Sequence, residues 1–300
     1  MKRILKILSI FFLIILIYNG IKNKNTTNSL REDKSDFAIS DTLMIEKIIL
    51  ENRSLEKIKL TRDNENKKWI LNDSLLANQH SINLILKTIK EMRVKQPISR
   101  SAVQNIIKRM AIQNTKVELF NIQKKIKTIY IGGETADQLG TYMMISGAKE
   151  PYIVHIPGFN GYLSSRFLCK KEAWRSKKIF TEKIIKASHQ IYNNQEIEID
   201  KQNFIFLDSI YCEQYIDKIL NIQEIKQRKP FLTFKTLSED STEQIRYCIR
   251  KKPVNKEKYA NDKFDKERFY LLHNETLTLI QYSQFKELIK SENIMKDFLP

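Results

Sequence analysis

The sequence has few of the residues on which chemistry most often depends. Its three cysteines, Cys169, Cys212 and Cys248, have no paired CxxC spacing, which disfavours a thiolate metal site. An odd number cannot form a complete disulfide framework, so we expect buried free thiols, with one bridge plus one free thiol as the alternative. None of the four histidines stands at a spacing that would chelate zinc. The sequence therefore predicts no metal site and no cofactor.

Glycine is also scarce, with seven residues in 300, and neither GxGxxG nor GxxxxGK[ST] occurs. The segment YIGGETADQLGT (130–141) holds Gly132, Gly133 and Gly140, whose backbone N–H groups could cradle a small anion. No helix is predicted to follow it, so a long hairpin loop is the favoured interpretation. Asp137 lies in the same segment, but two carboxylates there without a fixed partner make a weak metal site.

The sequence also lacks the pattern of residues that surrounds a catalytic serine. The stretch YIVHIPGFNGYLSSRF (152–167) carries His155 at the end of a predicted strand. A helix is predicted after Pro157, which would place Ser164 and Ser165 on a helix surface rather than on the sharp glycine-flanked turn of a nucleophile. We interpret His155 as a polar strand-end residue and predict no catalytic residue.

Positive charge is abundant, since 52 Lys and Arg against 35 Asp and Glu give a formal net charge of +17. Such an excess can attract nucleic acid, anionic lipid or an acidic polymer. No segment interleaves arginine with aromatic residues, which disfavours nucleic acid. Because the lysines are spread along the chain, we favour a compositional origin for the charge over a single binding patch.

The amino terminus carries the strongest local signal. In MKRILKILSIFFLIILIYNG, positive residues precede an apolar run that extends to Tyr18. This layout is typical of a secretion signal, and because Gly20 is the one small residue near its end, cleavage is disfavoured. The sequence predicts a signal anchor over residues 1–21, with a buried core helix as the alternative. The anchor predicts a single-pass inner-membrane protein whose body lies on the periplasmic side, after a polar linker at 22–36.

The body reads as two tandem α+β modules, 37–176 and 177–300, each built mainly from antiparallel strands with packed helices. In the first module, apolar residues at helical spacing predict helices over 82–92 and 101–110, the first capped by Ser81. Short alternating runs predict the strands, which lie at 46–50, 56–62, 68–72, 116–120, 125–133, 141–146 and 152–156.

The second half resembles the first, which predicts an internal duplication. Residues 203–208 match the strand before the first long helix, and residues 215–231 align with 82–98, each ending on a proline. Two further matches join 141–147 to 268–274 and 152–163 to 278–289. In this alignment the second copy lacks the helix at 101–110 and carries the charged loop 251–268 instead.

Several of these motifs occur in an order that resembles a known bacterial family, domain of unknown function 4340. The motifs are WILN (69–72), RVKQP (93–97), IGG (131–133), GTYM (140–143), VHIPGFNGYL (154–163), WR (174–175) and DKERFYLL (265–272). The resemblance covers residues 37–290. It implies a membrane-anchored or lipid-anchored envelope protein, of a kind common in the Bacteroidota and in some cases attached to ABC-type export or gliding systems. It implies no catalytic residues, and this chain has no amino-terminal cysteine to carry a lipid.

Three functions compete on this basis. The first is a non-enzymatic, membrane-tethered module that binds proteins of an envelope or transport assembly. The second is an extracytoplasmic hydrolase or small-ligand-binding protein that uses the 130–141 loop with His155. The third is binding to an anionic polymer or lipid surface through the lysines. Arg175, beside Trp174, is a further candidate contact and could instead brace the seam between the two modules.

Overall fold

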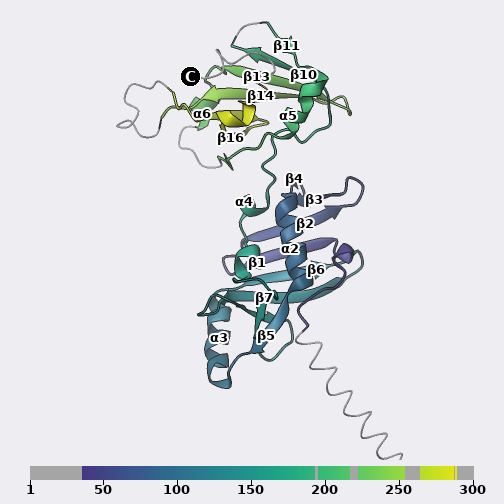
Figure 1. Cartoon of the computed structure of the whole chain (residues 1–300), viewed down its shortest axis with the longest axis vertical. Helices are drawn as coiled ribbons and strands as arrows, with labels where there is room; N and C mark the ends of the chain where they lie inside the picture. The colour runs from purple at the N-terminus through teal and green to yellow at the C-terminus, as the bar shows by residue number, and fades with distance from the viewer. Residues whose placement is uncertain (1–35, 193–194, 217–221, 254–263, 287, 289–300) are drawn as a thin grey trace, which may run out of the picture. The chain divides into compact units, whose positions relative to one another are not determined.

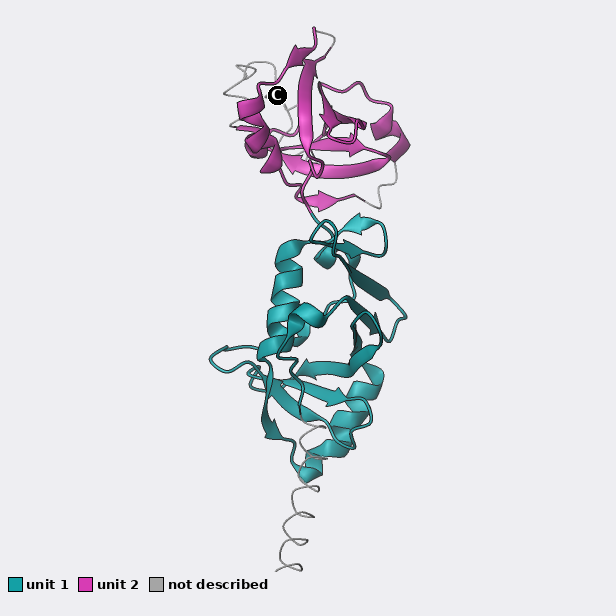
Figure 2. Ribbon diagram, turned by 90° about the vertical axis from the view of Figure 1, so that its right-hand side faces the viewer, with its two compact units in different colours: residues 1–176 teal, residues 177–300 magenta. Residues whose placement is uncertain are grey.

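The computed structural model describes residues 36–192, 195–216, 222–253, 264–286 and 288 (Figure 1). The chain divides between Ser176 and Lys177 into two compact units (Figure 2). Each unit holds one antiparallel sheet and a few helices, which confirms the predicted α+β class. The predicted anchor at 1–21 and the linker up to residue 35 lie outside the described residues. Within the described ranges, no helix is both long and apolar enough to span a bilayer.

Unit 1 is built on a nine-stranded sheet with the order β4-β3-β2-β1-β6-β7-β8-β9-β5. Every neighbouring pair is antiparallel. The strands are β1 (Lys47–Asn52), β2 (Lys57–Asp63), β3 (Lys68–Leu71), β4 (Leu75–Leu76), β5 (Arg93–Pro97), β6 (Thr115–Phe120), β7 (Lys125–Glu134), β8 (Thr141–Ile145) and β9 (Tyr152–His155). The helical segments are η1 (Thr42–Met44), α2 (Gln79–Glu91), α3 (Arg100–Ile112), η2 (Ser164–Arg166) and α4 (Lys171–Trp174).

A different helix packs on each face of this sheet. On the inner face, α2 buries Ile82, Ile85 and Ile89 in the main core, as its apolar spacing predicts. On the outer face, α3 packs Ile106 and Met110 against the sheet in a second, smaller core. The predicted cap of α2 was one turn too late. Asn78 is the cap, and its Oδ1 accepts hydrogen bonds from the backbone N–H groups of the second and third residues after it.

Unit 2 is built on a seven-stranded sheet with the order β11-β10-β13-β14-β15-β16-β12. Its pairs are again all antiparallel. The strands are β10 (Ile184–Ile191), β11 (Ile197–Glu198), β12 (Gln214–Tyr215), β13 (Leu232–Ser238), β14 (Glu243–Arg250), β15 (Arg268–His273) and β16 (Thr276–Gln281). The helical segments are η3 (Lys201–Asn203), α5 (Phe204–Asp208), α6 (Ile222–Lys226) and η4 (Tyr282–Phe285).

The two sheets share one connectivity. Taken in chain order, β10, β11, β12, β13, β14, β15 and β16 occupy the places of β1, β2, β5, β6, β7, β8 and β9. The helices follow the same rule, because α5 packs Leu207 into the main core of unit 2, as α2 does in unit 1. In turn, α6 packs Ile225 on the outer face, as α3 does. Unit 1 adds β3 and β4 at one edge.

The strand pairs also supply a residue-level correspondence. In unit 1 one row of paired residues crosses four strands, and a matching row crosses the four equivalent strands of unit 2. These rows are Leu50–Val117–Ile129–Ile145 and Ile191–Leu232–Cys248–Leu271. All eight side chains are buried in the main core of their unit. We use this correspondence below to compare equivalent positions.

The repeat alignment predicted from sequence is wrong in its middle part. Residues 203–208, predicted as a strand, include helix α5, and α5 rather than 215–231 stands at the place of α2. The periodicity of so short an apolar run does not show whether it is a strand or a helix. In the structure the run is helical and packs Leu207 into the core. The second unit also has a helix at the place of 101–110, namely α6.

The helix predicted after Pro157 is wrong as well. Only Ser164–Arg166 form a single 3-10 turn, and the residues before them form turns. Gly158 has a φ of +78°, a left-handed conformation that cannot continue a right-handed helix. The backbone N–H of Leu163 donates to Oγ1 of Thr141 at 2.6 Å instead of to a helical carbonyl. The stretch is therefore a tethered loop that covers the end of the sheet.

Candidate functional site

A groove in unit 1 has a volume of about 530 Å³. It lies where β1 ends, β6 begins and β7 ends, and the loop 162–170 forms one of its walls. Two of the predicted site residues, Gly132 and Gly133, line it. Asp137, Gly140 and His155 do not belong to its lining, so the structure separates the predicted candidates.

One wall of the groove is a tightly bonded turn between β1 and β2. Oδ1 of Asn52 accepts from the backbone N–H of Glu56 at 3.0 Å, and Nδ2 of Asn52 donates to the Glu56 carboxylate at 2.6 Å. Leu55 adopts a φ of +61° within this turn. Because the turn satisfies its own polar groups, the wall is ordered before any ligand arrives.

The rim of the groove combines polar and apolar side chains. Ile112, at the end of α3, has 78% of its surface exposed, and Leu168 has 43%. Tyr162 adds an aromatic ring, while Asn114 and Lys170 supply polar groups. Exposed apolar side chains gathered around a concave surface mark an interaction site more often than scattered ones do. Sequence reasoning missed Ile112 and Leu168, because each sits at the end of its segment, where an apolar pattern gives no sign of a groove.

The two glycines of the groove have different reasons to be small. A Cβ on Gly132 would lie 2.9 Å from Cγ of Met110 and 3.0 Å from the backbone oxygen of Tyr142. A Cβ on Gly133 would meet nothing closer than the Arg109 guanidinium at 3.9 Å. Gly132 is therefore required for the packing of α3 on the sheet, whereas Gly133 leaves room in the groove.

The groove holds one thiol, that of Cys169, which is buried. Burial raises the pKa of Cys169 to about 11, although a hydrogen bond with Thr115 acts in the opposite direction. A thiol with this pKa is protonated at neutral pH and is a poor nucleophile. The lining includes Ser164 and Ser165 but no histidine that could serve as their base. Among the described residues of the lining, the serines therefore have no histidine beside them, and the thiol is held in its protonated form.

The 135–140 loop closes on itself. The Asp137 carboxylate accepts from Oγ1 of Thr135 at 2.5 Å and from the backbone N–H of Leu139 at 3.1 Å. These bonds, the Thr135 hydroxyl first, lower the pKa of Asp137. A Cβ on Gly140 would lie 2.6 Å from the Ile153 side chain, so this glycine serves packing. The loop is a hairpin turn that binds its own carboxylate, not a cradle for an external anion.

His155 and Arg175 lie in other surroundings. His155 is half-buried on β9 and pairs with Arg93 of the edge strand β5. Within the described ranges no hydrogen bond joins it to Asp137 or to a serine. Arg175 pairs through its backbone with Ala77, beside β4, so it belongs to unit 1. The same ranges contain no group of three His, Cys, Asp or Glu side chains able to hold a metal ion.

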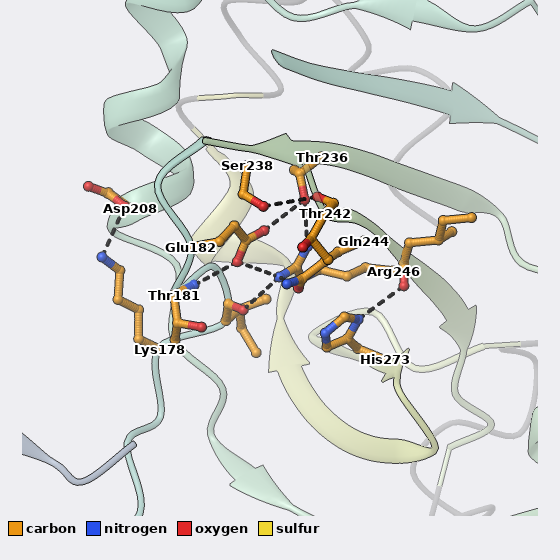
Figure 3. Close-up of polar contacts among 12 residues, drawn as sticks. Lys178, Thr181, Glu182, Asp208, Thr236, Ser238, Thr242, Gln244, Arg246 and His273 are labelled. Carbon is orange, nitrogen blue, oxygen red and sulfur yellow. Dashed lines mark hydrogen bonds and ion pairs between the residues drawn. The ribbon is translucent and has the colours of Figure 1, made fainter. Parts of the chain in front are cut away.

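Unit 2 contains a buried ion pair that the sequence analysis did not predict (Figure 3). Arg246, 1% exposed, donates to the Glu182 carboxylate at 2.8 Å and to Oγ1 of Thr236 at 2.9 Å. Its guanidinium also lies 4.3 Å from the ring centre of Phe180. Burial lowers the pKa of Arg246, and the nearby Glu182 carboxylate opposes this effect. The network ties the segment before β10 to the sheet and is structural.

Two further buried cations of unit 2, Arg250 and Lys251, lie at the end of β14. Arg250 lies 3.8 Å from the ring centre of Phe231 and donates to the Tyr282 hydroxyl at 2.7 Å. Lys251 forms an ion pair with Asp265 at 2.7 Å. The sequence IRYCIR (245–250) could have predicted these buried arginines. Both alternate with outward-facing residues, and both share the core-facing side of β14 with Cys248.

Comparison with known proteins gives no match to any family model, to any curated protein or to any solved structure. The resemblance to the family of unknown function therefore remains a prediction from the motifs.

Proposed function

We propose that this chain is a membrane-anchored, extracytoplasmic binding module that takes part in an envelope or transport assembly and performs no reaction itself. In this proposal the unit 1 groove receives an extended segment of a partner protein. The observation that carries the proposal is the lining of the groove. Exposed Ile112 and Leu168 stand beside amide side chains, and the one thiol is held protonated. Apolar anchors with a few polar groups suit recognition of a peptide.

The proposed location rests on the sequence of the amino terminus. The positive residues and apolar run of residues 1–21 support a signal anchor in the inner membrane, with the body on the periplasmic side. The motif resemblance supports the same setting and adds an export or gliding assembly as the partner class.

We also infer that the two units arose by internal duplication. The matching order of seven strands and the matching placement of one helix on each sheet face support this inference. A duplicated scaffold offers two related sheets whose surfaces can diverge, which suits a module that binds more than one component.

A crosslinking experiment on the full chain in native membranes tests the groove. A photoreactive residue at position 112 should crosslink a discrete partner protein, whereas the same residue at position 122 should not. Ile122 is a matched control, since it is 83% exposed and lies in the turn at the opposite ends of β6 and β7. Ile112→Asp should abolish co-purification of that partner, and Ile122→Asp should leave it unchanged. Equal crosslinking from both positions, or none from position 112, would refute the proposed role of the groove.

A further inference from the structure

A second hollow lies on the outer face of the unit 2 sheet, on β10, β13 and β14, and has a volume of about 300 Å³. Its lining includes Tyr192, Tyr247, Lys229, Lys235, Gln190 and Thr233. The volume is at the low end for small-molecule sites, which suits a single ring-sized group. The proposed peptide groove belongs to the other unit, so this hollow is independent of it.

The two tyrosines present aromatic surface to solvent. Tyr192 is 47% exposed and Tyr247 is 38% exposed. Tyr192 has a φ of +48°, a backbone conformation that is unfavourable for a bulky side chain. Its backbone N–H donates to the Phe231 carbonyl at 3.0 Å, which holds this conformation in place. Strained residues of this kind are concentrated at binding sites, where the fold maintains a side-chain direction that the chain would not choose.

The polar part of the lining is cationic and rich in donors. No carboxylate lines the hollow, whereas two lysines do. Lys235 is fixed by the Glu196 carboxylate at 2.5 Å, and this bond raises the pKa of the lysine. Within the described residues Lys229 has no ion pair, so its ammonium group faces solvent with its charge uncompensated. Gln190 and Thr233 add neutral groups that can bond to hydroxyls.

We propose that this hollow binds an acidic sugar, namely a uronic acid unit of an anionic polysaccharide. The tyrosine rings provide flat apolar surface for the C–H face of a pyranose ring. Lys229, which has no ion pair within the described residues, complements a carboxylate, and Gln190 and Thr233 lie within the same lining to bond to ring hydroxyls. An acidic peptide would use Lys229 but would leave the two exposed tyrosine rings without a sugar face to contact.

Unit 1 lacks this combination at the equivalent place. The residue correspondence puts Glu118 where unit 2 has Thr233, and Thr128 where unit 2 has Tyr247. Thr128 offers no ring for a sugar to stack on, and Glu118 engages Lys116 at 3.1 Å and Lys125 at 3.0 Å. The proposed sugar site is therefore a property of unit 2 alone.

Titration calorimetry of the full chain in detergent with trigalacturonate tests the proposal. Binding should weaken about tenfold in Tyr247→Ala and about tenfold in Lys229→Gln. Lys201→Gln, which removes an exposed charge of unit 2 outside the hollow, should leave it unchanged. Neutral maltotriose should bind at least tenfold more weakly than trigalacturonate.

Three results would overturn the proposal. One is no heat of binding with trigalacturonate in the wild-type chain. Another is wild-type affinity in Tyr247→Ala, which would show charge attraction without ring recognition. The third is equal or tighter binding of hexaglutamate, which would assign the hollow to acidic peptides. Circular dichroism of each variant confirms that lost binding is not lost folding.

Discussion

The two units share one strand connectivity, yet the residues at one end of the equivalent strands β7 and β14 differ. In unit 1, the last four residues of β7, Ile131 to Glu134, all line the groove. The residue correspondence places Arg250 of β14 at Ile131, and Lys251, the next residue, then corresponds to Gly132 by counting along the chain. Both cations are 8% exposed and are bonded to neighbours within unit 2. The two units thus differ at this strand end, where small residues line a groove in unit 1 and buried cations occupy the corresponding places in unit 2.

A second pair of equivalent positions carries a cation in both units. Lys127 of unit 1 corresponds to Arg246 of unit 2, since their partners Leu119 and Phe234 are equivalent. Nζ of Lys127 donates to the carbonyl of Asp36 at 2.6 Å, and Arg246 bonds to the segment before β10. In both units a cation on the same strand holds the chain as it enters the sheet. The scaffold retains this clamp while the strand ends diverge.

Arg246 is more deeply buried than Lys127, and this difference gives the largest predicted effect on stability. Arg246→Ala should lower the free energy of unfolding of unit 2 by about 3–5 kcal/mol, because it leaves the Glu182 carboxylate buried without its partner. Lys127→Ala should cost unit 1 only about 1.5 kcal/mol, since its carbonyl partners are neutral and its side chain is 17% exposed. Hydrogen exchange in urea, followed separately for peptides of each unit, measures both values. Equal losses in the two variants would contradict a special role for the buried pair.

Gly132 and Gly133 provide the next largest contrast. Gly132→Ala should destabilise unit 1 by about 1–3 kcal/mol, because the new Cβ meets Met110 and the backbone of Tyr142. Gly133→Ala should stay within about 0.5 kcal/mol of the wild type, since its Cβ enters open space. Urea unfolding of the two variants side by side provides the test. Destabilisation by Gly133→Ala as large as by Gly132→Ala would show that both glycines serve packing.

The sequence could predict what depends on local pattern. The alternating burial of Ile48 and Leu50 and the helical spacing of α2 follow from side-chain periodicity, so the α+β class was predictable. The sequence grouped the glycine pair at 132–133 with Asp137 and Gly140, and the structure places it beside other residues. Asp137 and Gly140 are near it in sequence, whereas the groove is completed by Ile112 and Cys169 from distant segments. The buried Arg246–Glu182 pair also joins residues 64 positions apart, and local pattern carries no distance information of that kind.

The thiol of Cys169 gives a smaller, pH-dependent effect. Its pKa is about 11 in the folded chain and 9.0 without the effects of the fold. Below pH 9 both states hold the proton, so the full stability is present. Between pH 9 and 11 the unfolded chain ionises first, and stability should fall as pH rises. Cys169→Ala should remove this part of the slope. Alkylation of Cys169 by iodoacetamide, measured by mass spectrometry across pH, should have its midpoint near 11, and a midpoint at or below 9 would contradict the burial argument.

Gly133→Lys is expected to change stability least and to test the comparison of the two units most directly. Counted along the chain from Ile131 and its counterpart Arg250, position 133 corresponds to Lys252 of unit 2, so the substitution gives unit 1 the side chain found there. The new side chain has open space at its Cβ, and stability should stay within about 0.5 kcal/mol of the wild type. Its length and charge would fill the groove beside Ile112, so crosslinking from position 112 should be lost. Gly133→Ala is the matched control and should retain the crosslink. If Gly133→Lys folds normally and still crosslinks the partner, the partner does not occupy the groove at the end of β7. Its contact with Ile112 would then be a contact with α3 alone.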